Sequence, residues 1–240
     1  SEGSNYPDLF TNCYYFFFFF DFLPHFMTFP FFLGSVLSGV SSFLSSFGLV
    51  VAAVFGFDLS RLLLNAEEMI ARCGPDTPLA ENPGVSLGAA LAGFTMSGHN
   101  KLTILTSPKL TSFARWGEQL IAESTGKDGV GSLPVVGEPV LDSSAYGDDR
   151  VFIYLRLAED DNGVLDKAMA HLQDAGHRII RIDLQNNEDL AGEFYRWELA
   201  TAIAGSILGL NPFDQPNVEM AKRATNQMLS QHNSDELIEL

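Results

Sequence analysis

The chain has 240 residues, of which 14 are basic and 30 are acidic, so its formal net charge is −16 at pH 7. A chain of this length can bury one large core or two small ones. The strong negative charge repels nucleic-acid phosphates and anionic membrane surfaces, which argues against a nucleic-acid-binding protein. The two cysteines, Cys13 and Cys73, are too few for a disulfide framework, which favours a reducing, cytoplasmic compartment.

The first 57 residues differ in composition from the rest of the chain. They hold 15 of the 20 phenylalanines, whereas all 14 basic residues come after position 60. Residues 26–57 carry no charge and are long enough to cross a bilayer, but no basic flank sets an orientation. We interpret residues 1–43 as an irregular Phe-rich extension that arises from a translated unspliced tract, with a hydrophobic anchor as the alternative. Membrane contact is expected only by adsorption of this segment, and residues 234–240 are expected to form an acidic tail.

From about residue 58 the chain alternates helical and strand-like segments. Helices are expected at residues 59–72, 82–93, 110–123, 164–175 and 189–210, and strands at 102–106, 151–157 and 179–184. Gly74-Pro75 ends the first of these helices and Gly176 ends the fourth. Apolar strands separated by helices of this length predict an α/β fold, in which helices cover both faces of a parallel sheet.

Two patterns that suggest other chemistry are weak. Gly84-Val-Ser-Leu-Gly88 matches the nucleophile elbow of serine hydrolases, but Asn82-Pro83 stands where that motif needs a strand. None of the five histidines shares metal-ligand spacing with another histidine or a cysteine. Neither a serine hydrolase nor a metal or cofactor site is therefore predicted.

Glu123 is a candidate general base. It ends the amphipathic segment 110–123 and stands just before the loop Ser-Thr-Gly-Lys127. A carboxylate at such a helix end can be partly buried, its pKa can rise towards the working pH, and it can then transfer protons. The alternative is a surface glutamate in an ordinary last turn.

The segment from Gly205 to Lys222 combines an Asn-Pro loop, a Phe-Asp-Gln-Pro turn and a helix start. The helix start puts Glu219 and Lys222 one turn apart on one face. Such a segment can direct the amide of Gln215 and the ammonium of Lys222 into one cleft. The alternative is an ordinary helix N-terminus with Pro216 in its first turn and a solvated lysine.

Both segments resemble phosphoglucose isomerases. Gln119-Leu-x-x-Glu-Ser-x-Gly-Lys127 is similar to a motif of the bacterial enzymes, and Gln215 and Lys222 have the seven-residue spacing of the family's C-terminal signature. The resemblance covers about residues 44–230, which correspond to the C-terminal half of such an enzyme. It implies a sugar-isomerase (SIS) domain over residues 44–233.

The resemblance implies an aldose-ketose isomerase that interconverts glucose 6-phosphate and fructose 6-phosphate through a cis-enediol, without metal or cofactor. Glu123 would transfer the proton between C2 and C1, Lys222 would assist ring opening and stabilise oxygen charge, and Gln215 would hold the sugar phosphate. Family members of this fold are commonly homodimers, which is the expectation here. Residues 138–150 and 193–202 resemble the isomerase half of fused transaldolase/phosphoglucose isomerase proteins.

The sequence also departs from the family. Val40 stands where the family has an arginine that steadies the enediolate. Ser144 stands where the bacterial enzymes have a ring-opening histidine, for which Lys222 is the first replacement and His99 the second. The family's phosphate cradle belongs to the N-terminal half. We therefore expect this chain not to isomerise sugar phosphate by itself, and the alternative function is a non-catalytic sugar-phosphate-binding or interaction module of the same fold.

Overall fold

The computed structural model describes residues 46–231, except residue 128 and residues 214–215. Its helices are α2 (Ser46–Val54), α3 (Leu59–Arg72), α4 (Pro83–Met96), α5 (Thr111–Thr125), α6 (Gly163–Asp174), α7 (Leu190–Leu208) and α8 (Pro216–Gln231). Its strands are β1 (Lys101–Thr106), β2 (Leu133–Val136), β3 (Arg150–Leu157) and β4 (Arg178–Leu184). Short 3-10 turns lie at η3 (Pro108–Leu110), η4 (Ser143–Ala145) and η5 (Asn187–Asp189). The Phe-rich extension, Val40, Gln215 and the acidic tail lie outside the described residues.

The strands form one parallel sheet in the order β2-β1-β3-β4. The predicted α/β fold with a parallel sheet is therefore confirmed. The sequence pattern missed β2, which is only four residues long and contains Pro134. Proline cannot donate to a strand ladder, and β2 tolerates it because it is the last strand at one side of the sheet.

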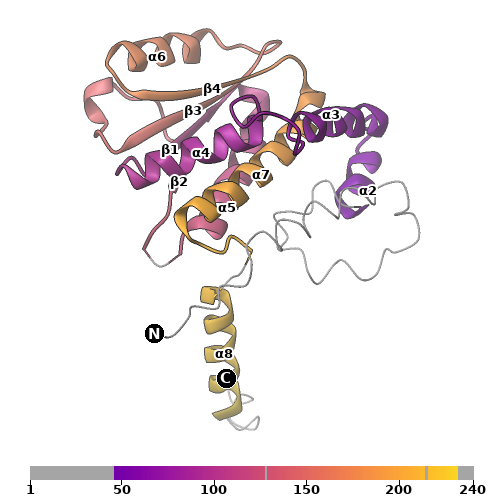
Figure 1. Cartoon of the computed structure of the whole chain (residues 1–240), viewed down its shortest axis with the longest axis vertical. Coiled ribbons are helices and arrows are strands. Elements are labelled where there is room, and N and C mark those ends of the chain that lie inside the picture. Colours follow the sequence, from indigo (N-terminus) through magenta and orange to yellow (C-terminus); the bar gives the residue numbers. More distant parts are fainter. Residues whose placement is uncertain (1–45, 128, 214–215, 232–240) are drawn as a thin grey trace, which may run out of the picture.

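Helices cover both faces of this sheet, as Figure 1 shows. The side chains of α4, α5 and α7 pack on one face, and those of α6 pack on the other. The central strand β3 has no exposed surface from Val151 to Leu155. Such a strand forms an unbroken apolar run because neither of its faces meets water.

Helix α7 is buried along most of its length, between the sheet and helices α3 and α4. A β-carbon at Gly88 of α4 would lie 2.5 Å from the carbonyl oxygen of Ala200 in α7, so the two backbones approach too closely for any larger residue. Gly88, which belongs to the elbow-like pattern, thus serves packing inside a helix. No helix among the described residues is long and apolar enough to cross a membrane.

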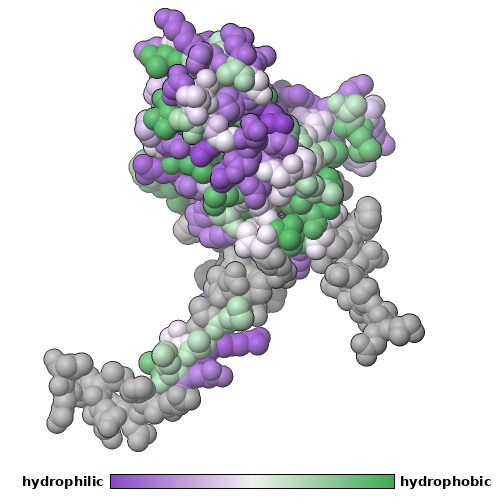
Figure 2. Space-filling model, turned by 90° about the vertical axis from the view of Figure 1, so that its left-hand side faces the viewer, coloured by the Kyte–Doolittle hydropathy of each residue, from purple (hydrophilic) through white to green (hydrophobic). Residues whose placement is uncertain are grey.

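The described C-terminal helix α8 extends away from the sheet and its covering helices in Figure 1, and Figure 2 shows it as a separate arm. Its side chains from Lys222 to Leu229 are exposed. The sheet and helices α3 to α7 therefore form the packed body of the described chain.

Candidate functional site

Glu123 lies in the last turn of α5, beside the amino ends of the strands. Helix α5 follows the carboxyl end of β1 and runs back to the start of β2, so its C-terminus reaches the end of the sheet where the parallel strands begin. Gln119 Nε2 donates to Glu123 Oε1 at 3.0 Å, one turn apart. The Glu123 side chain is exposed, rather than partly buried as its position suggested. A proton-transferring role there requires a substrate or another segment to exclude water.

An aromatic cluster fixes α5 against α7. The ring of Trp116 lies 4.5 Å from that of Phe194, and Phe113 lies 5.0 Å from Phe194 and 5.6 Å from Trp197, between ring centroids. A β-carbon at Gly117 would lie 3.1 Å from the Trp197 ring, so the α5 backbone rests on the indole. Edge-to-face aromatic contacts of this kind add to the free energy of burial, and they hold the helix that carries the candidate base.

The turn after Glu123 folds back on the end of α5. Thr125 Oγ1 donates to the Ile121 carbonyl at 2.8 Å, and the Val130 amide donates to the Lys127 carbonyl at 2.9 Å. A β-carbon at Gly131 would lie 2.3 Å from the Thr125 carbonyl oxygen, so the returning chain passes where only glycine fits. These contacts hold the described residues of the turn against the end of α5.

The Asn-Pro loop begins at the same end of the sheet. Gly209 ends α7 in the left-handed region at φ +71°, and the Leu210 amide donates to the Gly205 carbonyl at 2.8 Å. The Phe213 amide donates to Asn211 Oδ1 at 3.0 Å, which forms an Asx turn. These contacts set the direction in which the chain leaves α7 towards Gln215.

Lys127 joins the two motif loops. Its side chain is buried, and Nζ donates to the backbone carbonyl of Asn211, 84 residues away. The turn that follows Glu123 therefore lies against the loop that leads to Gln215. Lys127 ends the motif at residues 119–127, and nothing in the local pattern shows what its ammonium reaches.

The remaining predicted residues are more scattered. Lys222 is exposed on α8, and its placement in one cleft with Glu123 and Gln215 stays a prediction. His99 follows α4, and its Nδ1 lies 2.9 Å from Ser97 Oγ at the amino end of β1. Ser144 lies in the loop between β2 and β3, where its hydroxyl donates to Asp142 Oδ1 at 2.6 Å.

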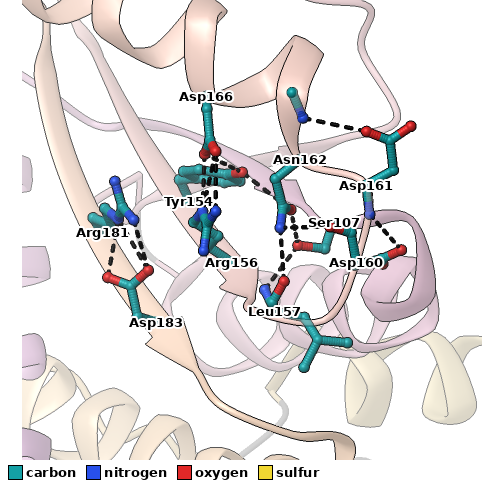
Figure 3. Close-up of polar contacts among 11 residues, drawn as sticks. Ser107, Tyr154, Arg156, Leu157, Asp160, Asp161, Asn162, Asp166, Arg181 and Asp183 are labelled. Carbon is teal, nitrogen blue, oxygen red and sulfur yellow. Dashed lines mark hydrogen bonds and ion pairs between the residues drawn. The ribbon is translucent and has the colours of Figure 1, made fainter.

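A buried polar network lies at the opposite end of the sheet, where β1 and β3 end (Figure 3). Ser107 Oγ donates to Asn162 Oδ1 at 2.5 Å and accepts from the Leu157 amide at 2.8 Å. Asn162 Nδ2 donates to the Leu157 carbonyl at 2.7 Å and to the Asp160 carbonyl at 3.0 Å. Ser107 has no exposed surface and Asn162 is 4% exposed, so this network is buried where the two strands end.

Charged groups continue the network towards β4 (Figure 3). Asp166 accepts from the Tyr154 hydroxyl at 3.0 Å and from Arg156 Nε at 3.0 Å. The Arg156 guanidinium holds the pKa of Asp166 below its usual value, and burial followed by the Asp166 contact raises the pKa of Tyr154. Arg181 and Asp183 pair along β4 at 2.8 Å, and such charges keep an outer strand from pairing with other chains.

Helix α7 carries two buried carboxylates that sequence reasoning did not single out. Glu193 accepts from Arg196 Nε and Nη2 at 2.9 and 2.7 Å. Burial raises the pKa of Glu193, although the ion pair with Arg196 acts to lower it. Glu198 is 8% exposed, its Oε1 has no hydrogen-bond partner, and burial raises its pKa to about 8. The signal was present in the sequence as charged residues inside an apolar helix, but only packing shows which of them are buried.

No group of three or more metal-ligating side chains occurs in the part of the chain that the structure describes.

These features define a parallel α/β protein in which two motif loops meet at the amino end of the sheet. Solved structures share this fold. A hypothetical protein from Thermus thermophilus matches with a TM-score of 0.64 at 21% identity, over 76% of this chain and 53% of that one. A glucose-6-phosphate isomerase from Chlamydia trachomatis matches with a TM-score of 0.53 at 16% identity, over 71% of this chain and 42% of that one.

Curated relatives at higher identity carry one name. Glucose-6-phosphate isomerase of Rubrobacter xylanophilus is 33% identical over 79% of this chain and 52% of the relative. That of Heliobacterium modesticaldum is 30% identical over 78% of this chain and 50% of the relative. The chain spans about half the length of the curated relatives it matches, and no protein-family model matches it. The resemblance inferred from the motifs is thus confirmed as homology to proteins of this name, while the transaldolase fusion stays a prediction.

Proposed function

We propose that this chain provides one half of a sugar-phosphate isomerase that interconverts glucose 6-phosphate and fructose 6-phosphate. The observation that carries the proposal is the contact between Lys127 and Asn211, which brings the Glu123 turn and the loop before Gln215 together. The relatives' shared name supports the reaction and favours it over a non-catalytic module.

Within this proposal each motif residue has a separate task. Glu123 removes the proton at C2 and returns it at C1, so that one carboxylate acts first as base and then as acid. Gln215 binds the sugar phosphate through its amide. Lys222 assists ring opening and offsets charge on the sugar oxygens during the cis-enediol step.

The exposure of Glu123 and the net charge both indicate that more protein is needed. A sugar phosphate carries close to two negative charges at neutral pH, and a chain of net charge −16 repels it unless a local cradle offsets that charge. The proposal therefore assigns the cradle that offsets the phosphate charge, and the covering of Glu123, to the half of the relatives' length that this chain does not match.

The test joins this chain behind the N-terminal half of the Rubrobacter xylanophilus relative and measures isomerisation in a coupled assay. The relative's own C-terminal half, joined in the same way, shows that the added half is competent. We expect turnover by the chimera and none by the 240-residue chain. An inactive chimera beside an active control would refute the isomerase proposal, and full turnover by the chain alone would show that no second half is needed.

A further inference from the structure

We propose that Lys127 is a positioning residue that sets the separation between the turn after Glu123 and the loop that leads to Gln215. This role deepens the proposed isomerase function and rests on it. In this role Lys127 holds two neighbouring segments in place, and no contact between Lys127 and the substrate is proposed.

Lys127 is buried, which is unusual for a lysine and suggests that its contact with Asn211 has a specific role. Lysine is among the residues least often found fully buried, because its ammonium loses water on entering the protein. Lys127 is nevertheless 6% exposed, and its Nζ donates to the Asn211 carbonyl. Hydrogen bonds from an ionised donor are roughly twice as strong as neutral ones, so this bond is suited to holding two segments together.

Both ends of the contact are themselves constrained. On one side, Thr125 and Gly131 hold the turn against the end of α5. On the other side, a β-carbon at Gly205 would lie 3.0 Å from the Pro212 ring, so the loop after α7 packs against its own helix. A bond between two segments that each pack against the end of a helix transmits position from one to the other.

The consequence for the proposed reaction is geometric. Glu123 lies four residues before Lys127, and Gln215 lies four residues after Asn211. If Gln215 holds the sugar while Glu123 moves its proton, the distance between these segments decides whether the carboxylate reaches C2. A misplacement of about 1 Å at such a site costs roughly 100-fold in rate.

The first test is amide hydrogen exchange in the full 240-residue chain, which needs no turnover. Lys127→Met keeps the apolar stem and removes the donor, and we expect exchange at Leu210 and Phe213 to become about 10- to 100-fold faster. Lys127→Arg keeps a charged donor and should restore slow exchange. Lys101→Met is the matched control, because Lys101 also lies at the amino end of the sheet and pairs with Asp149 at 2.5 Å, but it joins no motif loop.

Unchanged exchange at Leu210 in Lys127→Met would overturn the proposal. So would a uniform loss of protection that includes the amides of β3, since Lys127 would then stabilise the whole fold rather than position two loops. A local effect that Lys127→Arg reverses supports it.

The second test uses the chimera described above. We expect Lys127→Met to lower kcat by about 10- to 100-fold with KM changed less than about threefold, and Lys127→Arg to recover most of the rate. Unchanged kcat in an active chimera would refute the positioning role. An inactive chimera would refute the isomerase proposal instead, and the exchange experiment would still decide whether Lys127 holds the two loops.

Discussion

The two ends of the sheet differ in how their polar groups are used. At the carboxyl end, Ser107 and Asn162 bond to each other and to the Leu157 backbone inside the protein. At the amino end, Glu123 is exposed, and the ammonium of Lys127 donates to the neighbouring motif loop. One end is thus closed by its own hydrogen bonds, while the other presents Glu123, to which the proposed proton transfer is assigned.

This difference runs against a common expectation for open parallel sheets. Ligands of such folds usually bind in the crevice beyond the carboxyl ends of the strands. Here Ser107 and Asn162 fill that position between β1 and β3. The helices α5 and α7 run antiparallel to the strands, so their C-terminal loops, which carry both motifs, meet at the other end. The position of a site follows from where the reactive residues lie, and the fold class alone does not determine it.

The largest expected effect comes from the amino end. In an active chimera, Glu123→Gln should lower turnover by about 10²- to 10⁴-fold, because the amide cannot accept the C2 proton. Glu118→Gln, the same change in the same helix, is the control and should keep its rate. Proton exchange at C2 followed by NMR is the measurement. Near wild-type proton exchange at C2 in Glu123→Gln would show that a group other than Glu123 transfers the proton.

Buried polar atoms usually have a hydrogen-bond partner. Oε1 of Glu198 in α7 has none, so its cost to stability can be measured. Its folded pKa of about 8 lies above the ordinary value, so the folded state binds the extra proton. The contribution of Glu198 to stability should be largest below about pH 4.5, fall as the pH rises to about 8, and then level off. At roughly 1.4 kcal/mol per pKa unit, the fall attributable to Glu198 is of the order of 5 kcal/mol.

Urea unfolding across this pH range measures the Glu198 effect. Glu198→Gln should remove the fall and be more stable than the parent above about pH 8. Glu193→Gln is the contrast, because it takes the carboxylate away from Arg196 and should destabilise the protein. A parent chain whose stability is flat from about pH 5 to about pH 8 would contradict the burial of Glu198 with Oε1 left without a partner.

The carboxyl-end network predicts a moderate loss of stability without a specific loss of activity. Asn162→Ala leaves the Ser107 hydroxyl and the Leu157 carbonyl buried without this partner, which should lower the free energy of unfolding by about 2–3 kcal/mol. Asp161→Ala changes the neighbouring residue and should cost less than about 0.5 kcal/mol. If Asn162→Ala abolishes turnover in a chimera that remains folded, the carboxyl end also takes part in the reaction.

The smallest expected change in stability is at Lys222. Its side chain is exposed on α8, so Lys222→Met should alter the free energy of unfolding by less than about 0.5 kcal/mol. The same variant should lower turnover in the chimera clearly if Lys222 assists ring opening. Equal turnover for Lys222→Met and the parent would show that Lys222 does not open the ring. His99, the second candidate, would then be the next residue to substitute.

Local patterns predicted most of the secondary structure. Helix α7 was expected over residues 189–210 and spans Leu190–Leu208, because an apolar helix that ends in glycine is readable from its own residues. The short strand β2 was missed, since four residues with Pro134 give no period. Strand order was not predicted, because it depends on which strands pair across the whole domain.

The sequence by itself determined the fold class and the two motifs, because periodicity, caps and residue spacing act over a few turns of chain. Only the tertiary structure decided that Lys127 reaches Asn211, that Ser107 meets Asn162, and that Glu198 lies buried without a partner for Oε1. Each of these facts joins residues far apart in the chain or depends on the packing around a helix. Burial and long-range contact arise from how the helices pack on the sheet, and no local pattern contains that information.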